Sequence, residues 1–192
     1  MSYADSWNKI VAQVKKNISA KEEIVQNAWE MLFSMVFNYS DSEIDSQRSV
    51  KMGVMAKRAD IVIKNGAEDL FVVELKRHVL HEGQEQLFSY LNQLKVDLGV
   101  LACDKLYIYD YDFTSKEEAF SALEIPFEQD NSNGVRFVEL FSKENFDKEK
   151  IRAFIKEGNA QKQATSEIKK EHDSPLVLEL LKKPFYAEIS FC

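Results

Sequence analysis

The feature that most constrains the fold is the segment 59–77, ADIVIKNGAEDLFVVELKR, in which two apolar runs flank a polar turn. Runs this rich in Val and Ile around an Asn-Gly pair predict two antiparallel strands joined as a hairpin. Strands this apolar are usually buried on both faces, where an unpaired charge is costly. Asp60, Glu74 and Lys76 nevertheless interrupt them. The hairpin therefore predicts a buried sheet that carries a charged cluster.

The length of the turn decides whether these charges meet. With a five-residue loop over 65–69, cross-strand partners stand roughly 4.5–5.5 Å apart, and alternation puts Glu74 and Lys76 on one face. The pairs in that register are Lys64–Leu70, Val62–Val72 and Asp60–Glu74. A two-residue turn at Asn65-Gly66 would instead pair Asp60 with Phe71 and weaken the cluster. Both registers stay open at this point.

The order of the remaining elements predicts an α/β fold with a mixed β-sheet flanked by helices. Ser19 is the expected N-cap of the second helix, with Glu22 completing a capping box. Loops are expected at 40–47 and 78–83. Helices are expected at 4–18, 20–38, 84–96 and 143–158, and strands at 47–55, 98–104, 105–112 and 134–142. A polar linker or exposed helix follows at 158–174, and an apolar tail at 175–192 is expected to pack on this domain or on a partner subunit.

Composition excludes several classes of protein. The 192 residues carry a net charge of −7, with a pI of about 5.1, which argues against a generally basic nucleic-acid-binding surface. No stretch approaches the ~20 apolar residues that span a bilayer, and the N-terminus does not look like a secretory signal. Two cysteines are too few for a disulfide framework. We expect a cytoplasmic protein with no membrane partner.

The charged cluster indicates a particular chemistry. Two carboxylates held close repel each other unless a cation lies between them. Mg²⁺ suits this role because it binds oxygen ligands and commonly joins one or two carboxylates to a substrate phosphate. A neighbouring lysine can orient or deprotonate water, or stabilise charge that develops on phosphorus. Together these groups predict metal-assisted hydrolysis of a phosphodiester.

The same residues resemble a known family. Asp60, thirteen intervening residues and then Glu74-Leu75-Lys76 resemble the PD-(D/E)xK nuclease signature, with Ala59 in place of the proline. Gln86 and Tyr90, on one face of the next helix, resemble the QxxxY motif of RecB-like nucleases and of the N-terminal nuclease domain of type I restriction enzyme R subunits. The resemblance covers roughly residues 19–112, and the chain has no GxxxxGK[ST] translocase motif.

This resemblance implies a restriction-endonuclease-like domain over residues 1–157 that acts as a Mg²⁺-dependent DNA endonuclease, with Mn²⁺ as a substitute. Asp60, Glu74 and the Leu75 carbonyl would bind the metal, and Lys76 would serve the attacking water. Gln86 and Tyr90 would line the site. An additional metal-side carboxylate is expected from the preceding helix, and Glu22 is preferred over Glu23 because it extends the core-facing stripe.

Other interpretations stay open. The domain could be a catalytically silent nucleic-acid-binding or assembly module of the same fold, or a nuclease directed at RNA. The expected partners are DNA, together with restriction or defence subunits or a second copy of the chain. The histidines at 78 and 81 are expected to be solvated and not to bind metal. The basic residues around the hairpin are candidates for phosphate contacts or simply a solvated surface: Arg48, Lys51, Lys57, Arg58 and Arg77.

Overall fold

The computed structural model describes residues 1–52, 55–76, 80–113 and 119–172. The chain divides into two compact units, Met1–Lys156 and Glu157–Cys192, and the sheet belongs to the first. In the part of the chain that is described, no helix has the length and apolar character needed to cross a bilayer.

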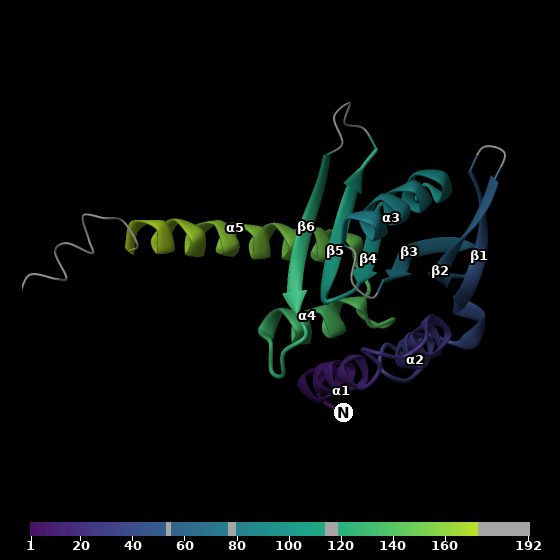
Figure 1. Ribbon diagram of the computed structural model, residues 1–192, viewed down its shortest axis with the longest axis horizontal. Helices are drawn as coiled ribbons and strands as arrows, with labels where there is room; N and C mark the ends of the chain where they lie inside the picture. The colour runs from purple at the N-terminus through teal and green to yellow at the C-terminus, as the bar shows by residue number, and fades with distance from the viewer. Residues whose placement is uncertain (53–54, 77–79, 114–118, 173–192) are drawn as a thin grey trace, which may run out of the picture. The chain divides into compact units, whose positions relative to one another are not determined.

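A mixed sheet of six strands forms the centre of the first unit (Figure 1). Its strands lie in chain order and are β1 (Ile44–Met52), β2 (Met55–Asn65), β3 (Glu68–Leu75), β4 (Leu98–Ala102), β5 (Lys105–Asp112) and β6 (Ala119–Pro126). All neighbouring strands are antiparallel except β3 and β4, which are parallel and are joined through helix α3 (Leu80–Leu94). A parallel pair needs such a crossover. The predicted α/β class and mixed sheet are confirmed.

Helices cover both faces of this sheet because its strands alternate apolar side chains between two cores. Ile61, Ile63 and Val73 face the larger core, with residues of α1 (Tyr3–Lys16), α2 (Glu22–Met35), α4 (Ser132–Phe141) and the first turns of α5 (Lys148–His172). Val62 and Val72 face the smaller core, where Leu87, Tyr90 and Leu91 of α3 pack against them. Glu74 shares the parity of Val72 and pairs with Leu101 of the smaller core, so it belongs to the α3 side.

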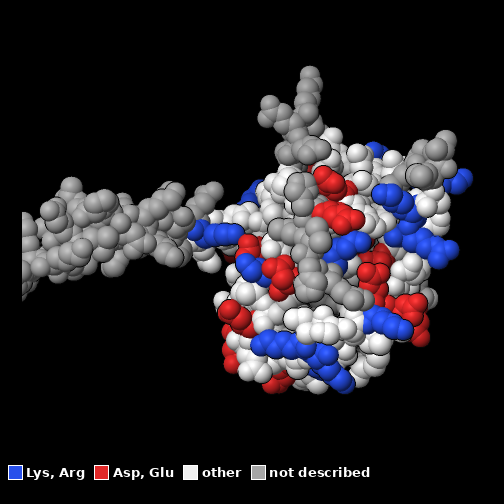
Figure 2. All heavy atoms as spheres, in the orientation of Figure 1, with Lys and Arg blue, Asp and Glu red and all other residues white. Residues whose placement is uncertain are grey.

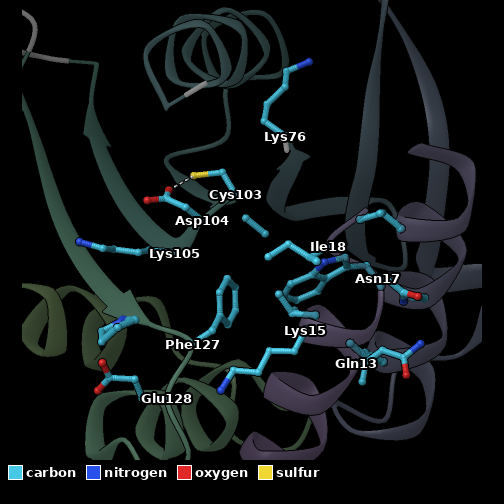
Figure 3. Close-up of a pocket in the computed structure, with 17 residues that line it drawn as sticks. Gln13, Lys15, Asn17, Ile18, Lys76, Cys103, Asp104, Lys105, Phe127 and Glu128 are labelled. Carbon is cyan, nitrogen blue, oxygen red and sulfur yellow. Dashed lines mark hydrogen bonds between the residues drawn. The ribbon is translucent and has the colours of Figure 1, made fainter. Parts of the chain in front are cut away.

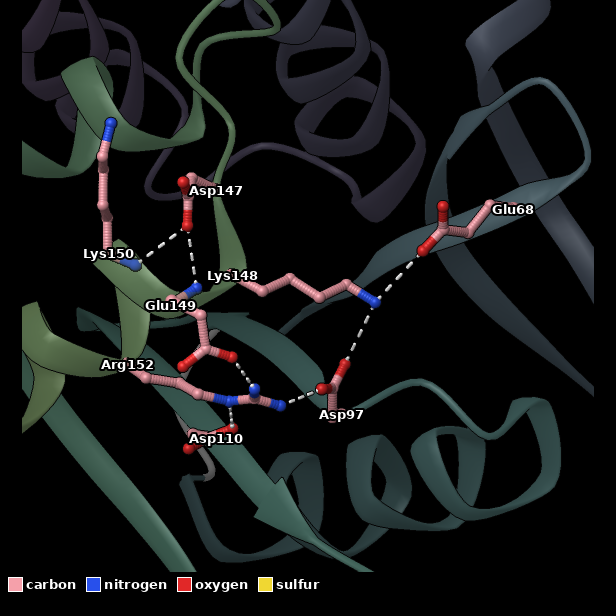
Figure 4. Close-up of polar contacts among 8 residues, drawn as sticks. All are labelled: Glu68, Asp97, Asp110, Asp147, Lys148, Glu149, Lys150 and Arg152. Atoms are coloured by element: carbon pink, nitrogen blue, oxygen red, sulfur yellow. Dashed lines mark hydrogen bonds and ion pairs between the residues drawn. The ribbon is translucent and has the colours of Figure 1, made fainter.

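The first turns of α5 are fixed to the sheet by a polar network (Figure 4). Arg152 donates from Nε to Asp110 Oδ1 at 3.1 Å and also pairs with Asp97. Lys148 Nζ lies 3.3 Å from Glu68 Oε1 and 3.4 Å from Asp97 Oδ1. These contacts join α5 to β3, to β5 and to the residue just before β4.

The β2–β3 turn differs from both predicted turns. It consists of Gly66 and Ala67, and Asn65 pairs with Glu68. Gly66 has a φ of 62°, in the left-handed region that a side chain disfavours. Lys64 pairs with Asp69 in the same register, and a β-bulge then shifts the pairing, so that Ile63 pairs with Phe71 and Leu70 has no partner on β2. The predicted Lys64–Leu70 pair is therefore wrong, whereas Val62 does pair with Val72.

Two helices begin differently from the prediction. Helix α2 is capped by Lys21 without a side-chain hydrogen bond, so the predicted Ser19–Glu22 capping box is wrong and Glu22 occupies the first helical position. The predicted loop 78–83 overlaps α3, which starts at Leu80, and His78 lies outside the described residues.

Residues 134–142 and the start of β1 were predicted wrongly, and β6 was missed. Residues 134–142 form helix α4 and not a strand, because Asn131 caps the helix by accepting from the Gly134 N–H at 3.0 Å, and Phe137, Val138 and Phe141 bury one helical face. β1 already starts at Ile44, within the predicted loop, and β6 was not predicted at all. Helix α5 extends through 158–172, so the described part of the predicted linker or exposed helix is helical. The apolar tail 175–192 lies outside the described residues.

Candidate active site

The candidate site is a polar cavity of about 600 Å³ at the point where β3 ends. Five elements contribute to its wall, and the cavity is therefore a product of the tertiary fold. Its lining residues are Glu22, Glu23, Val25, Gln26, Asn27, Gln47, Asp60, Leu75, Lys76 and Gln86.

Asp60 is oriented by the backbone of the neighbouring strand. Its Oδ2 accepts the Leu75 N–H at 2.8 Å, across the β2–β3 pair. Burial raises the pKa of Asp60, and the Leu75 N–H and the Lys76 charge oppose that rise. Glu22 adds a further, smaller upward influence on this pKa. The structure thus brings Asp60 to the Glu-Leu-Lys end of β3, as the longer predicted loop required.

Glu74 is the most unusual group in the site. Its side chain is 0% exposed, and among the described residues neither carboxylate oxygen receives a hydrogen bond of good geometry. Its nearest compensation is the ion pair to Lys76, in which Nζ lies 3.1 Å from Oε1. Burial, followed by the charge of Asp60, raises the pKa of Glu74 to about 8. Buried polar groups in proteins nearly always have partners, so this carboxylate is suited to a ligand such as a cation.

Lys76 completes the cluster as a cation. Burial would lower its pKa, but the charge and hydrogen bond of Glu74, helped by Asp60 and Glu22, outweigh burial and raise it. The ammonium is therefore protonated at neutral pH. In this state Lys76 is a hydrogen-bond donor that can orient water or stabilise a phosphate oxygen, and it is not a base.

Gln86 and Tyr90 link helix α3 to strand β2. Gln86 Nε2 donates to the Tyr90 hydroxyl at 2.7 Å, and this hydroxyl donates to the Arg58 carbonyl at 2.7 Å. Gln86 also lines the cavity, whereas Tyr90 is 0% exposed and lies behind it. Burial raises the pKa of Tyr90 to about 12. The pair therefore holds the strand position two residues before Asp60.

The expected additional metal ligands are Glu22 and the Leu75 carbonyl. Glu22 and Leu75 line the cavity. Within the described ranges, however, no three His, Cys, Asp or Glu side chains gather closely enough to hold a metal ion. A direct bond from Glu22 to the metal therefore stays a prediction, as does the Leu75 carbonyl.

Two glutamines in the cavity wall were missed by the sequence analysis. Gln47 Nε2 donates to Gln26 Oε1 at 2.6 Å and lies 3.5 Å from Asp60 Oδ1. Gln26 Nε2 donates to Glu30 at 2.9 Å and lies 3.5 Å from the Asp60 carbonyl. No sequence signal marks either glutamine as a site residue, because single glutamines in polar segments are common.

The predicted phosphate-binding residues separate into two groups. Arg48 is paired with Asp69 and Asp45, so it is less suited to phosphate than expected. Lys51, Lys57 and Arg58 are exposed on β1 and β2. Figure 2 shows basic and acidic side chains interspersed over the visible face, with basic ones gathered near the end of the β1–β2 hairpin. Arg77 lies outside the described residues.

A second cavity, of about 360 Å³, shares Lys76 and Val25 with the first (Figure 3). Its walls come from α1, α2, the β4–β5 turn and the end of β6, and include the rings of Trp29 and Phe127. This second cavity is mainly apolar and brings no further carboxylate close to Glu74.

The mixed sheet with helices on both faces is consistent with a restriction-endonuclease-like fold. Asp60 and Lys76 line its polar cavity, and the buried Glu74 is paired with Lys76 at the end of a central strand. Residues 21–126 match the family model described as the type I restriction enzyme R protein N terminus. The match covers more than half of the chain, which therefore belongs to this family. No curated protein matches the sequence.

Proposed function

We propose that this domain is a Mg²⁺-dependent DNA endonuclease of the PD-(D/E)xK type that acts in a restriction system. The family supports the restriction role. The observation that carries the proposed chemistry is Glu74, a fully buried carboxylate that is paired with Lys76 and raised in pKa by the charge of Asp60. Asp60 and Lys76 in turn line the polar cavity. Burying such a carboxylate costs free energy of folding. Groups with strongly perturbed pKa values cluster at functional sites.

The donor set fits Mg²⁺. Asp60 and Glu74 offer carboxylate oxygens, which this ion prefers, and two carboxylates are a common number for Mg²⁺ shared with a phosphate. The Leu75 carbonyl and Glu22, directly or through water, would complete the protein's share, and Mn²⁺ could substitute. Bound Mg²⁺ would supply a water of lowered pKa and would neutralise charge on the phosphate.

The chain's own residues provide orientation and charge. The Leu75 N–H fixes one oxygen of Asp60 and leaves the rest of that carboxylate for a cation. Lys76, as an ammonium, would donate a hydrogen bond to the attacking water or to a phosphate oxygen. Gln86 reaches the cavity while Tyr90 holds it against β2.

DNA is the expected substrate, and recruitment is the weak step for this chain alone. A net charge of −7 opposes attraction to phosphate. The exposed Lys51, Lys57 and Arg58 provide only a local basic strip. Restriction or defence subunits, or a second copy of the chain, would supply the remaining contacts.

The test compares cleavage by the wild type with cleavage by Asp60→Ala and Lys76→Ala. Plasmid, single-stranded DNA and RNA are incubated with each protein in Mg²⁺, Mn²⁺ or EDTA. Lys143→Ala is the control, because Lys143 is an exposed lysine paired with Glu43 away from the cavity. We expect metal-dependent DNA cleavage by the wild type and the control, and loss in both site variants.

Equal background cleavage by the wild type and all variants would refute the proposed nuclease activity. One observation favours a silent binding module as the second candidate, since Glu74 and Lys76 already form an ion pair with each other. DNA binding without cleavage would support that alternative, and metal-dependent loss of RNA alone would indicate an RNA-directed nuclease.

A further inference from the structure

We propose that Gln47 is a positioning residue that orients the Asp60 carboxylate for metal binding. The inference rests on the proposed function, in which Asp60 is a metal ligand. Three observations carry it: the backbone conformation of Gln47, its hydrogen bonds, and its place in the cavity wall.

The backbone of Gln47 is strained at the position facing Asp60. Ser46 pairs with Ile61 and Arg48 with Ala59, so Gln47 stands opposite Asp60 across the β1–β2 pair. Its φ is 54°, which is uncommon for any residue except glycine and unusual inside a strand. Strain of this kind persists only where the surrounding structure fixes it, and it concentrates at functional sites.

The side chain of Gln47 bridges helix α2 and strand β2. Its Nε2 atom donates to Gln26 Oε1 at 2.6 Å, and the same nitrogen lies 3.5 Å from Asp60 Oδ1. Gln26 is in turn held by its hydrogen bond to Glu30 on the next turn of α2. A rigid helix therefore fixes the amide that faces the aspartate.

An amide is the side chain that this position needs. An ionised aspartate only accepts hydrogen bonds, so both of its oxygens need donors to be held. The Leu75 N–H serves Oδ2, and Gln47 Nε2 lies 3.5 Å from Oδ1. Because Nε2 carries two hydrogens, Gln47 can contact Gln26 and Asp60 together, whereas glutamate at this position could donate to neither. Groups that orient a metal ligand typically change metal affinity by about 10–100-fold.

The variant Gln47→Gly separates a positioning role from a role in folding, because it should weaken metal binding without lowering stability. Gln47→Gly removes the amide but relieves the positive φ. We expect a melting temperature in EDTA that is unchanged or higher, together with a Kd for Mn²⁺ that rises by about tenfold or more. Both quantities are measured on the full chain, by thermal unfolding and by isothermal titration calorimetry.

Two further variants make the result specific. Lys95→Gly is the matched control, since Lys95 has a φ of 58° and lies on the surface at the end of α3. It should leave the Mn²⁺ affinity unchanged. Gln47→Asn tolerates the left-handed backbone but is one methylene shorter, so it should also weaken Mn²⁺ binding, and it serves if the glycine variant folds poorly.

The outcomes distinguish the two proposals. If the wild type binds Mn²⁺ and both Gln47 variants bind it equally well, Gln47 has no positioning role and the proposed metal site survives. If the wild type binds no Mn²⁺, the metal site itself is refuted and this inference is refuted with it. Weaker binding by the Gln47 variants, at preserved stability and with an unaffected Lys95→Gly, supports the inference.

Discussion

Asp60, which lines the cavity, and the fully buried Glu74 experience different environments. Asp60 accepts a backbone N–H, whereas Glu74 depends on the ion pair to Lys76. Burial, followed by the charge of Asp60, raises the pKa of Glu74 to about 8, and the Lys76 charge only partly opposes this rise. Without a bound cation, Glu74 is a source of instability as well as a candidate ligand.

Glu74→Gln should therefore stabilise the metal-free protein. A carboxyl with a raised folded pKa binds its proton more tightly when folded, so wild-type stability falls as pH rises from about 4.5 towards about 8. The variant has no charge to bury, so its advantage should be small near pH 4.5 and largest above pH 8. Thermal melts in EDTA across this range measure the difference, and a variant that is less stable at pH 8 would contradict it.

Glu43 should show the opposite pH dependence. Hydrogen bonding to Lys143 and then to Ser40 lowers its pKa to about 2. A lowered folded pKa adds stability above the unfolded value of about 4.5 and loses it as pH falls towards about 2. Glu43→Gln should cost about 1 kcal/mol at pH 7 and much less at pH 2–3. Urea unfolding at the two pH values provides the comparison.

Residue-scale features were only partly predictable. Asp60, Glu74 and Lys76 could be grouped because strand alternation and one hairpin connect them. Gln26 and Gln47 could not, because their contacts to each other and to Asp60 join α2, β1 and β2 and depend on the tertiary fold. The left-handed backbone of Gln47 has no sequence signature comparable to glycine at Gly66.

At the scale of elements, the Gln86–Tyr90 pair fixes α3 against β2. Tyr90→Phe would remove the bond to the Arg58 carbonyl and leave that acceptor without its partner. We expect a loss of about 1–2 kcal/mol in the free energy of unfolding. We also expect slower DNA cleavage, since the position of Asp60 depends on the same strand. Denaturant titration and cleavage rates test this, and an unchanged stability would argue that the hydroxyl contact is unimportant.

The packing of α1 against α4 depends on one small residue. A Cβ added to Gly134 would lie 2.0 Å from the Trp7 ring, closer than side chains can approach. Gly134→Ala should therefore destabilise the fold by about 1–3 kcal/mol, although alanine favours helices. Chemical denaturation measures the loss. Alanine at the exposed Glu139 of the same helix is the control.

Helices and strands were predicted correctly where the local sequence pattern agreed with the burial that the tertiary fold gives each side chain. Val62 and Val72 pair as expected although the turn was wrong, because the bulge at Leu70 compensates for the shorter turn and keeps both apolar faces buried. Residues 134–142 were predicted as a strand because Val and Phe favour strands intrinsically. They form a helix because Asn131 caps it and one helical face is buried. β6 was missed because FSALEIPF gives no clean alternation.

At the scale of the whole molecule, the family match ends before the core does. It stops at residue 126, but Phe137 and Phe141 of α4 and Ile155 of α5 are buried with the sheet. A chain ending at 126 should therefore expose a large apolar surface and aggregate, whereas one ending at 156 keeps the first compact unit. Size-exclusion chromatography and circular dichroism of both truncations test this, and a folded 1–126 fragment would contradict it.

Lys76 stands in the wall of two cavities of unlike character, one polar and one mainly apolar. A compound bound in the mainly apolar cavity would therefore contact the Lys76 side chain without entering the acidic cavity. Inhibitors of the proposed reaction need not imitate a phosphate, and medicinal chemistry could start from neutral aromatic fragments.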